Sequence, residues 1–351
     1  MAPALSYGPL FCDLDLDKPG RRIGEILLTH SDNIHCYGTI PIPITVIKGG
    51  DGPTVLLSGG NHGNEYEGQI LLRRLINILE SKDVNGRLII MPSLNFPAVK
   101  DIQRVSPLDQ GNLNRSFPGA PDQGPTKAIA GFITNHLLPI ADYGLDLHSG
   151  GAHANFVNCG FLCACDDPVL HKKNIKLAEA FGAPYTVVSP LGNTADGYDP
   201  VAHTMGVPFL SCELGGNCGS SVETLDVGWR GILGFLVETG ILNENHTLIQ
   251  QIENRKHGTR YLMAKDHHAN VMATHSGLME PLVELGDVVS AGQPVAKIHS
   301  MHGALDIVQT AKSSHDGIIA IQRTGCLVET GNYVCSVYSE IKHDALISLV
   351  E

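Results

Sequence analysis

The chain has 351 residues, is 43% hydrophobic and 17% charged, and carries 36 acidic against 24 basic side chains. This composition excludes a disordered or fibrous protein, and the net charge of −12 argues against nucleic acid or an anionic membrane as the partner. No apolar run approaches the ~18–20 residues that span a bilayer, and Met1–Leu14 lacks the features of a secretory signal. We therefore expect a cytoplasmic protein that binds a small molecule.

Apolar runs typical of buried strands alternate with helical patterns through the first two thirds of the chain. The predicted strands are Thr54–Ser58, Arg87–Met91, Tyr143–Leu147 and Val207–Cys212. The predicted helices are Glu67–Glu80, Lys127–Leu138, His171–Phe181 and Val227–Glu238. This alternation predicts an α/β sheet with helices on its faces. Beyond about Leu242 short alternating segments take over, which predicts one domain over residues 1–250 and a β-rich accessory domain over 251–351.

The accessory domain contains an internal repeat of glycine and valine. One half has Gly277, Gly286, Gly292 and Val295, and the other has Gly317, Gly325, Gly331 and Val334 at nearly the same spacing. Two such halves are expected to pack on each other as a small all-β sandwich or barrel. The repeat resembles biotinyl/lipoyl carrier modules, but His299–Gly303, where the modified lysine of a carrier would stand, contains no lysine. We therefore expect a structural or interface role.

The densest group of cysteines comprises Cys159, Cys163 and Cys165. They lie in an apolar stretch that is typical of a buried strand, and alternate residues of a strand face opposite ways. This placement favours buried thiols over a metal site.

A first group of candidate site residues follows the strand Thr54–Ser58. His62 and Glu65 stand three residues apart in a glycine-rich turn, SGGNHGNEYEG, so one helical turn aims both side chains at one point. Ligands of open α/β sheets bind at such carboxyl ends of strands. By itself the pair has little specificity, and the glycines around it supply the context.

Two further strand ends carry ionisable residues. His148 ends the strand in LDLHSGG, where Asp146 is a suitable partner for its ring, and Glu213 ends the strand in PFLSCELGG. His148 together with His62 and Glu65 gives two His and one Glu, which is a common set of ligands for a catalytic zinc ion. Glu213 suits a proton shuttle for hydrolysis, with a fourth ligand or a surface turn residue as the alternatives.

A proline-rich loop, Pro92–Pro125, supplies a third group. It contains Arg104 and the segment GNLNRSFPG with Asn114 and Arg115. Long loops in compact domains are usually functional, and arginine binds carboxylates with two hydrogen bonds. Beside a hydrolytic metal, Arg115 with Asn114 would hold a substrate carboxylate; a solvated or salt-bridged Arg115 is the alternative.

These motifs, in this order, resemble the succinylglutamate desuccinylase/aspartoacylase family of zinc hydrolases, which is related to the zinc carboxypeptidases, over roughly residues 20–345. The resemblance implies a zinc-carboxypeptidase-like mixed sheet with helices on both faces. It implies one Zn²⁺ per chain held by His62, Glu65 and His148, with Glu213 as general base and acid.

The same resemblance implies that Asn114 and Arg115 hold the α-carboxylate of an N-acyl amino acid and that Arg104 stabilises the oxyanion. NHGNEYEG, NLNRSFPG and the carboxyl domain look most like the N-acetyl-L-2,4-diaminobutyrate deacetylases of ectoine degradation, while Gly151–Phe156 is unusual and would alter the substrate. The alternatives are a deacylase of the succinylglutamate or acetylaspartate type, a carboxypeptidase, and a non-catalytic zinc-binding or ligand-binding protein. The oligomeric state, a homo-oligomer included, is left open.

Overall fold

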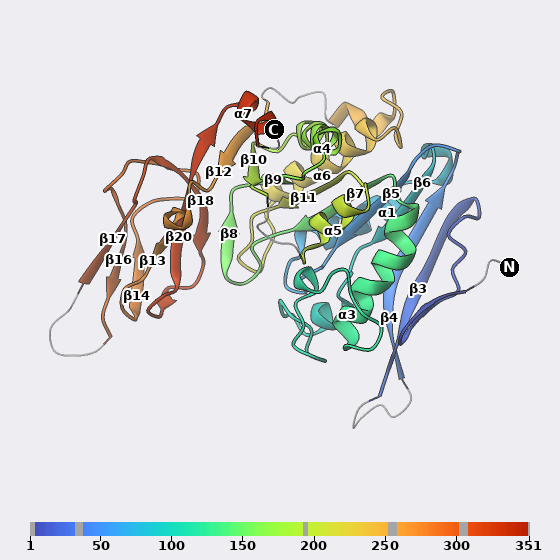
Figure 1. The fold of residues 1–351 in the computed structure, drawn as a ribbon, viewed down its shortest axis with the longest axis horizontal. Helices are drawn as coiled ribbons and strands as arrows, with labels where there is room; N and C mark the ends of the chain where they lie inside the picture. The colour runs from blue at the N-terminus through green and yellow to red at the C-terminus, as the bar shows by residue number, and fades with distance from the viewer. Residues whose placement is uncertain (1–3, 32–37, 192–195, 252–257, 302–307, 350–351) are drawn as a thin grey trace.

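The computed structural model describes residues 4–31, 38–191, 196–251, 258–301 and 308–349. Figure 1 shows the N-terminal two thirds as a sheet flanked by helices, with the C-terminal β-strands to one side. The stretch His299–Gly303, where the modified lysine of a carrier would stand, falls partly outside the described residues. None of the helices in these ranges has both the length and the apolar composition needed to cross a membrane.

The N-terminal part is built on one mixed sheet. In chain order its strands, with the small β8, are β1 (Leu5–Tyr7), β2 (Leu10–Cys12), β3 (Gly20–His30), β4 (Gly38–Lys48), β5 (Thr54–Gly59), β6 (Arg87–Met91), β7 (Tyr143–His148), β8 (Ala154–Phe156), β9 (Cys159–Cys163), β10 (Tyr185–Ser189) and β11 (Phe209–Glu213). Their order across the sheet is β1-β2-β3-β4-β6-β5-β7-β11-β9-β10. The helices are α1 (Glu67–Ile78), α2 (Phe96–Lys100), α3 (Pro125–Phe132), α4 (Pro168–Phe181), α5 (Tyr198–Thr204) and α6 (Val222–Glu238). The expectation of a mixed sheet with helices on both faces is confirmed.

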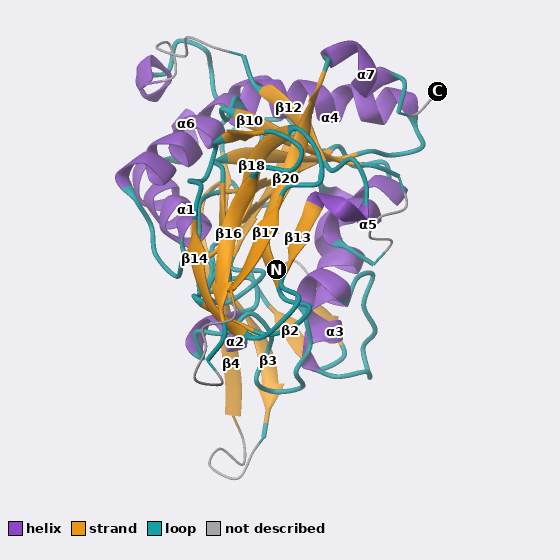
Figure 2. Cartoon of the chain, turned by 90° about the vertical axis from the view of Figure 1, so that its left-hand side faces the viewer, coloured by secondary structure: helices purple, strands orange, loops and turns teal. Residues whose placement is uncertain are grey.

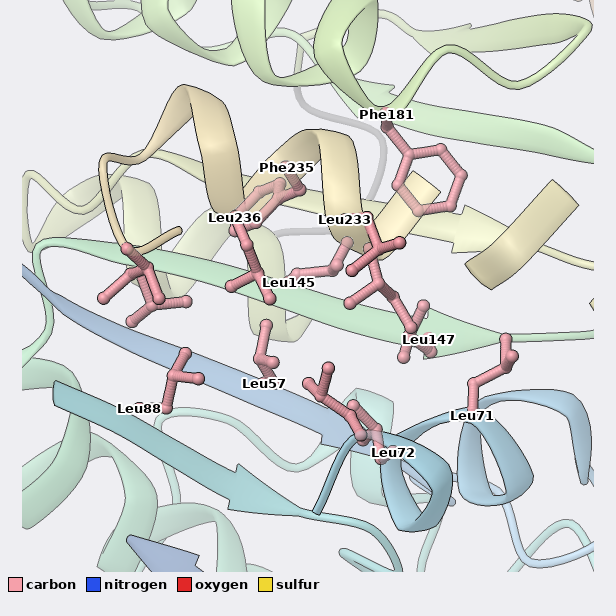
Figure 3. Close-up of a cluster of buried hydrophobic side chains, with 14 of the residues drawn as sticks. Leu57, Leu71, Leu72, Leu88, Leu145, Leu147, Phe181, Leu233, Phe235 and Leu236 are labelled. Atoms are coloured by element: carbon pink, nitrogen blue, oxygen red, sulfur yellow. The ribbon is translucent and has the colours of Figure 1, made fainter. Parts of the chain in front are cut away.

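The two faces of the sheet bury different clusters, because successive side chains of a strand point to opposite sides. Leu57 of β5 packs toward α1, α4 and α6, whereas its neighbour Leu56 packs toward α3 and α5. Figure 3 shows the first cluster, in which side chains of β5, β6 and β7 meet those of the covering helices. Strands buried on both faces explain the continuous apolar runs of the sequence.

Helix α1 begins at Glu67 as expected, whereas α4 and α6 begin earlier than expected. Helix α4 begins at Pro168, with the Asp167 carboxylate accepting from two backbone N–H groups, and α6 begins at Val222 after the cap residue Ser221. Both starts lie several residues before the expected ones and directly follow the capping residues, whose side chains accept from the first backbone N–H groups of each helix. The predicted loop Pro92–Pro125 also contains α2 and a short 3₁₀ turn at Leu113–Arg115.

The C-terminal part forms two packed sheets. Its strands, with the terminal helix, are β12 (Arg260–Met263), β13 (Asn270–Met272), β14 (Gly277–Pro281), β15 (Val288–Val289), β16 (Pro294–His299), β17 (Val308–Lys312), β18 (Gly317–Arg323), β19 (Leu327–Val328), β20 (Tyr333–Ile341) and α7 (His343–Ile347). The internal repeat is visible in the strands: β14 and β18 begin at Gly277 and Gly317, and Val295 and Val334 are buried second residues of β16 and β20. The predicted all-β sandwich is thus confirmed, and the likeness to carrier modules stays a prediction.

The two parts of the chain share hydrogen-bonded strands. β12 pairs in parallel with β10 and antiparallel with β20, which extends the large sheet into the C-terminal part. On the other side β8 pairs with β18. Figure 1 shows β8 next to β18, and Figure 2 shows β10, β12, β18 and β20 close together. A boundary at residue 250 stays a prediction, and two strand pairings cross it.

Candidate active site

Three neighbouring parallel strands deliver the candidate residues to one edge of the sheet. β5, β7 and β11 run in the same direction, with Gly59 opposite Leu147 and Glu213 opposite His148. His62 lies three residues past the end of β5, so all three strand ends meet. The turn there is tight: a Cβ on Gly63 would lie 2.0 Å from the Ala98 carbonyl carbon, which explains the glycine.

His62, Glu65 and His148 form one buried group. Glu65 Oε1 lies 2.7 Å from His62 Nδ1, and Glu65 Oε2 lies 2.9 Å from His148 Nδ1. Their ligand atoms all fall within 4.8 Å of one another. Burial opposes ionisation of Glu65, but the two imidazoles outweigh it and hold the pKa of Glu65 below its usual range. The structure therefore brings together the three residues predicted as metal ligands.

The outer nitrogens of both rings have partners of their own. His148 Nε2 lies 2.7 Å from Asp146 Oδ2, and His62 Nε2 lies 3.1 Å from Asn112 Oδ1. With the Nε2 atoms turned toward these oxygens, the Nδ1 atoms of both rings face the Glu65 carboxylate, which is the side on which a metal ion would be held. Asp146 is itself fixed by Ser58 Oγ at 2.6 Å and Asn61 Nδ2 at 2.9 Å. Two nitrogens and a carboxylate so arranged fit a catalytic zinc ion.

Glu213 lies beside this group with unused hydrogen-bonding capacity. Its Oε2 is buried and has no hydrogen-bond partner among the described residues. Burial, and next the charge of Glu65, raise the pKa of Glu213 above its usual range. A buried carboxyl group held in this way is suited to exchanging protons with a bound molecule.

The predicted loop residues also reach the site. Arg104 Nη1 lies 3.2 Å from His62 Nδ1 and 3.4 Å from Glu65 Oε1. Asn114 Oδ1 accepts from the backbone N–H of Tyr198 at 3.1 Å, which leaves its amide nitrogen, a donor only, for an anion. Arg115 Nη1 donates to the Asn114 carbonyl at 2.6 Å.

Two cavities meet at Arg104 and Glu213. One, of about 260 Å³, is lined by His62, Arg104, Asn114, Arg115, His148, Phe161, Cys163, Ser189, Gly197, Tyr198, Asp199, Pro200, Ser211 and Glu213. The other, of about 600 Å³, is lined by residues of both parts of the chain, among them Phe156, Arg323 and Tyr333. The unusual segment Gly151–Phe156 therefore lies along this second cavity. The cysteines on β9 are buried, as expected.

Some residues of the site carried no signal in the sequence. Asn112 stands in the GNLNR segment, yet only Asn114 and Arg115 of that segment were predicted. Ser58, Asn61 and Asp199 were not identified either. An asparagine two residues before a predicted binding pair, and a serine at a strand end, are too common to single out from one sequence.

Comparison with known proteins agrees with this geometry. Residues 51–238 match the model of the succinylglutamate desuccinylase/aspartoacylase catalytic domain. The chain is 36% identical over 329 residues, 94% of each chain, to the N-alpha-acetyl-L-2,4-diaminobutyric acid deacetylase of Halomonas elongata. The chain belongs to the succinylglutamate desuccinylase/aspartoacylase family.

Solved structures show the same likeness over the whole length. The product-bound ectoine utilization protein EutE (DoeB) from Ruegeria pomeroyi superimposes with a TM-score of 0.89 at 34% identity, covering 95% of this chain and 100% of that one. A succinylglutamate desuccinylase/aspartoacylase from Rhodobacter sphaeroides gives 0.87 at 34% identity, with the same coverage. The accessory β part is therefore shared with these relatives.

Proposed function

We propose that this chain is a zinc-dependent deacylase that hydrolyses the amide of an N-acyl amino acid, with N-acetyl-L-2,4-diaminobutyrate as the substrate and acetate and L-2,4-diaminobutyrate as the products. The family and the relatives at 34–36% identity support deacylation. The Halomonas elongata relative supports the choice of substrate. One observation carries the chemistry: the free, buried Oε2 of Glu213 lies on the same small cavity as His62 and His148.

His62, Glu65 and His148 would hold the zinc ion, which when bound supplies Lewis-acid polarisation of the acyl carbonyl and activation of a water molecule. Glu213 takes the proton of the attacking water and delivers it to the leaving amine. The guanidinium of Arg104 lies beside His62. It donates to the oxygen on which negative charge develops. Asn114 and Arg115 donate to the α-carboxylate, which fixes the amide near Glu213.

The proton-shuttle geometry also argues against the alternative of a zinc-binding protein without activity. Ligand binding alone gives no reason to bury a carboxyl oxygen that lacks a partner, because such burial is costly.

The proposal is tested by comparing kcat/KM of the zinc-loaded protein for N-acetyl-L-2,4-diaminobutyrate, N-acetylaspartate, N-succinylglutamate and a short peptide. We expect the diaminobutyrate substrate to be preferred. A preference for either dianionic substrate would overturn the substrate, and peptide hydrolysis alone would indicate a carboxypeptidase.

A further inference from the structure

Two carboxyl side chains line the 260 Å³ cavity, Glu213 and Asp199. Asp199 lies in the first turn of α5 and is only 9% exposed. Its Oδ1 accepts from Ser211 Oγ at 2.7 Å, and its Oδ2 accepts from Cys163 Sγ at 3.4 Å. Both donors are neutral. The family resemblance gave no role to this residue, and the chemistry of amide hydrolysis does not need it.

Asp199 takes part in none of the ion pairs of Lys and Arg in the described part of the chain, and the charge that favours its ionised form is the more distant one of His148. Burial raises the pKa of Asp199 to about 6, so the carboxyl group is mostly ionised at neutral pH without a direct ion pair to a cation among the described residues. Buried charges in proteins are usually paired. An acid of this kind on a cavity wall is suited to a cation that arrives with the ligand.

The position of Asp199 relative to the carboxylate anchor is fixed. Asn114 Oδ1 accepts from the N–H of Tyr198, the residue next to Asp199, so the anchor for the α-carboxylate and the turn that carries Asp199 are hydrogen-bonded to each other. Tyr198 is held in turn by its stacking on Phe117, with ring centroids 4.4 Å apart. The cavity thus presents Arg115 and Asn114 for an anion and Asp199 for a cation on one rigid unit.

We propose that Asp199 is the specificity-determining residue of this site and binds the ammonium group of a short, cationic amino-acid side chain while Asn114 and Arg115 bind the α-carboxylate. The inference rests on the proposed function and deepens it, because it explains how an N-acyl diamino acid is preferred over N-acylaspartate. A second carboxylate on the substrate side chain would face Asp199 and be repelled.

The test compares N-α-acetyl-L-2,4-diaminobutyrate with N-acetyl-L-norvaline, in which a methyl group stands in place of the ammonium. Asp199→Asn keeps the shape of the side chain and its hydrogen bond from Ser211. We expect the preference for the diaminobutyrate substrate, measured as a ratio of kcat/KM values, to fall by about 30-fold or more, because a buried charge pair is lost. Glu223→Gln is the matched control: it removes one negative charge at an exposed position of another cavity, and the ratio should not change.

A binding measurement provides a readout other than turnover. Calorimetric titration with the product L-2,4-diaminobutyrate and with L-norvaline should show tighter binding of the diamino acid to the unmodified protein and loss of that difference in Asp199→Asn. If Asp199→Asn does not fold, Ser211→Ala removes the donor to Oδ1 and should reduce the same ratio by a smaller factor. An unchanged ratio in a folded Asp199→Asn protein would overturn the proposal, even if kcat/KM fell by the same factor for both substrates. No turnover of any N-acyl amino acid by the unmodified protein would instead overturn the proposed function.

Discussion

The negative charge of Asp146 should strengthen metal binding through His148, and Asp146→Asn isolates that charge. Asp146 is fully buried, accepts from Ser58 and Asn61, and lies with Oδ2 2.7 Å from His148 Nε2. In the variant the amide oxygen can take the place of Oδ2, so that it still accepts from Asn61 and still faces His148 Nε2. The Ser58 hydroxyl can then turn and accept from the amide nitrogen. Ser58 and Asn61 each keep a hydrogen bond to the side chain, and the negative charge beside His148 is lost.

Replacing such a partner of a ligating histidine typically lowers metal affinity about 10–100-fold, or about 1.4–2.7 kcal/mol. We expect a loss of this size for Asp146→Asn, measured as the zinc Kd by competition with a chromophoric chelator. Asp142→Asn is the matched control, because this exposed acid stands just before the same strand and accepts from the Thr54 N–H at 2.8 Å, away from the site. A zinc Kd of Asp146→Asn equal to that of the control would refute the reasoning.

Three further results are expected. His62→Ala and His148→Ala each remove a ligand, so the purified proteins should lose stoichiometric zinc; full occupancy in both would contradict the ligand set. Glu213→Gln should keep its zinc while kcat falls about 10²–10⁴-fold, since the amide cannot take a proton; near-normal turnover would remove Glu213 from the mechanism. Burial lowers the pKa of His203 to about 4, so the stability present above pH ~6.5 should fall by roughly 2–4 kcal/mol as the pH drops through ~4. His203→Gln should flatten this part of the pH profile of the unfolding free energy, and an unchanged profile would speak against it.

The strand ends that form the site could be predicted from the sequence because each combines two strong local signals. A continuous apolar run predicts a strand buried on both faces, and the glycine turn after it predicts a ligand-binding edge. Arg87–Met91, buried along nearly its whole length, was predicted with its observed bounds. The strands before Thr54 were missed, because β3 alternates partly buried with exposed residues and includes two arginines and a glutamate.

Most of the residues that position His62 and His148 could not be predicted, because they come from distant parts of the chain. Asn112 and His62 are 50 residues apart, and Ser58 and Asp146 are 88 apart. Their pairing depends on the register of β5 against β7 and on the path of the loop before α3. Asp199 is a similar case, because no motif in the sequence marks it.

The pairing of β8 with β18 has a consequence for the order in which the protein folds during synthesis. The segment that follows His148 in the chain is tied to the last strands: Phe156 lies opposite Ile321, and the Tyr333 hydroxyl donates to the His153 carbonyl at 2.6 Å. Chains grow at roughly 5–20 residues per second, so the interval between Phe156 and Tyr333, 177 positions apart, is on the order of 9–35 s. For most of that time β8 has no partner from β18, whereas β10 receives β12 earlier, because Tyr185 and its partner Arg260 are only 75 positions apart. The wall of the larger cavity therefore closes only when the carboxyl-terminal strands leave the ribosome.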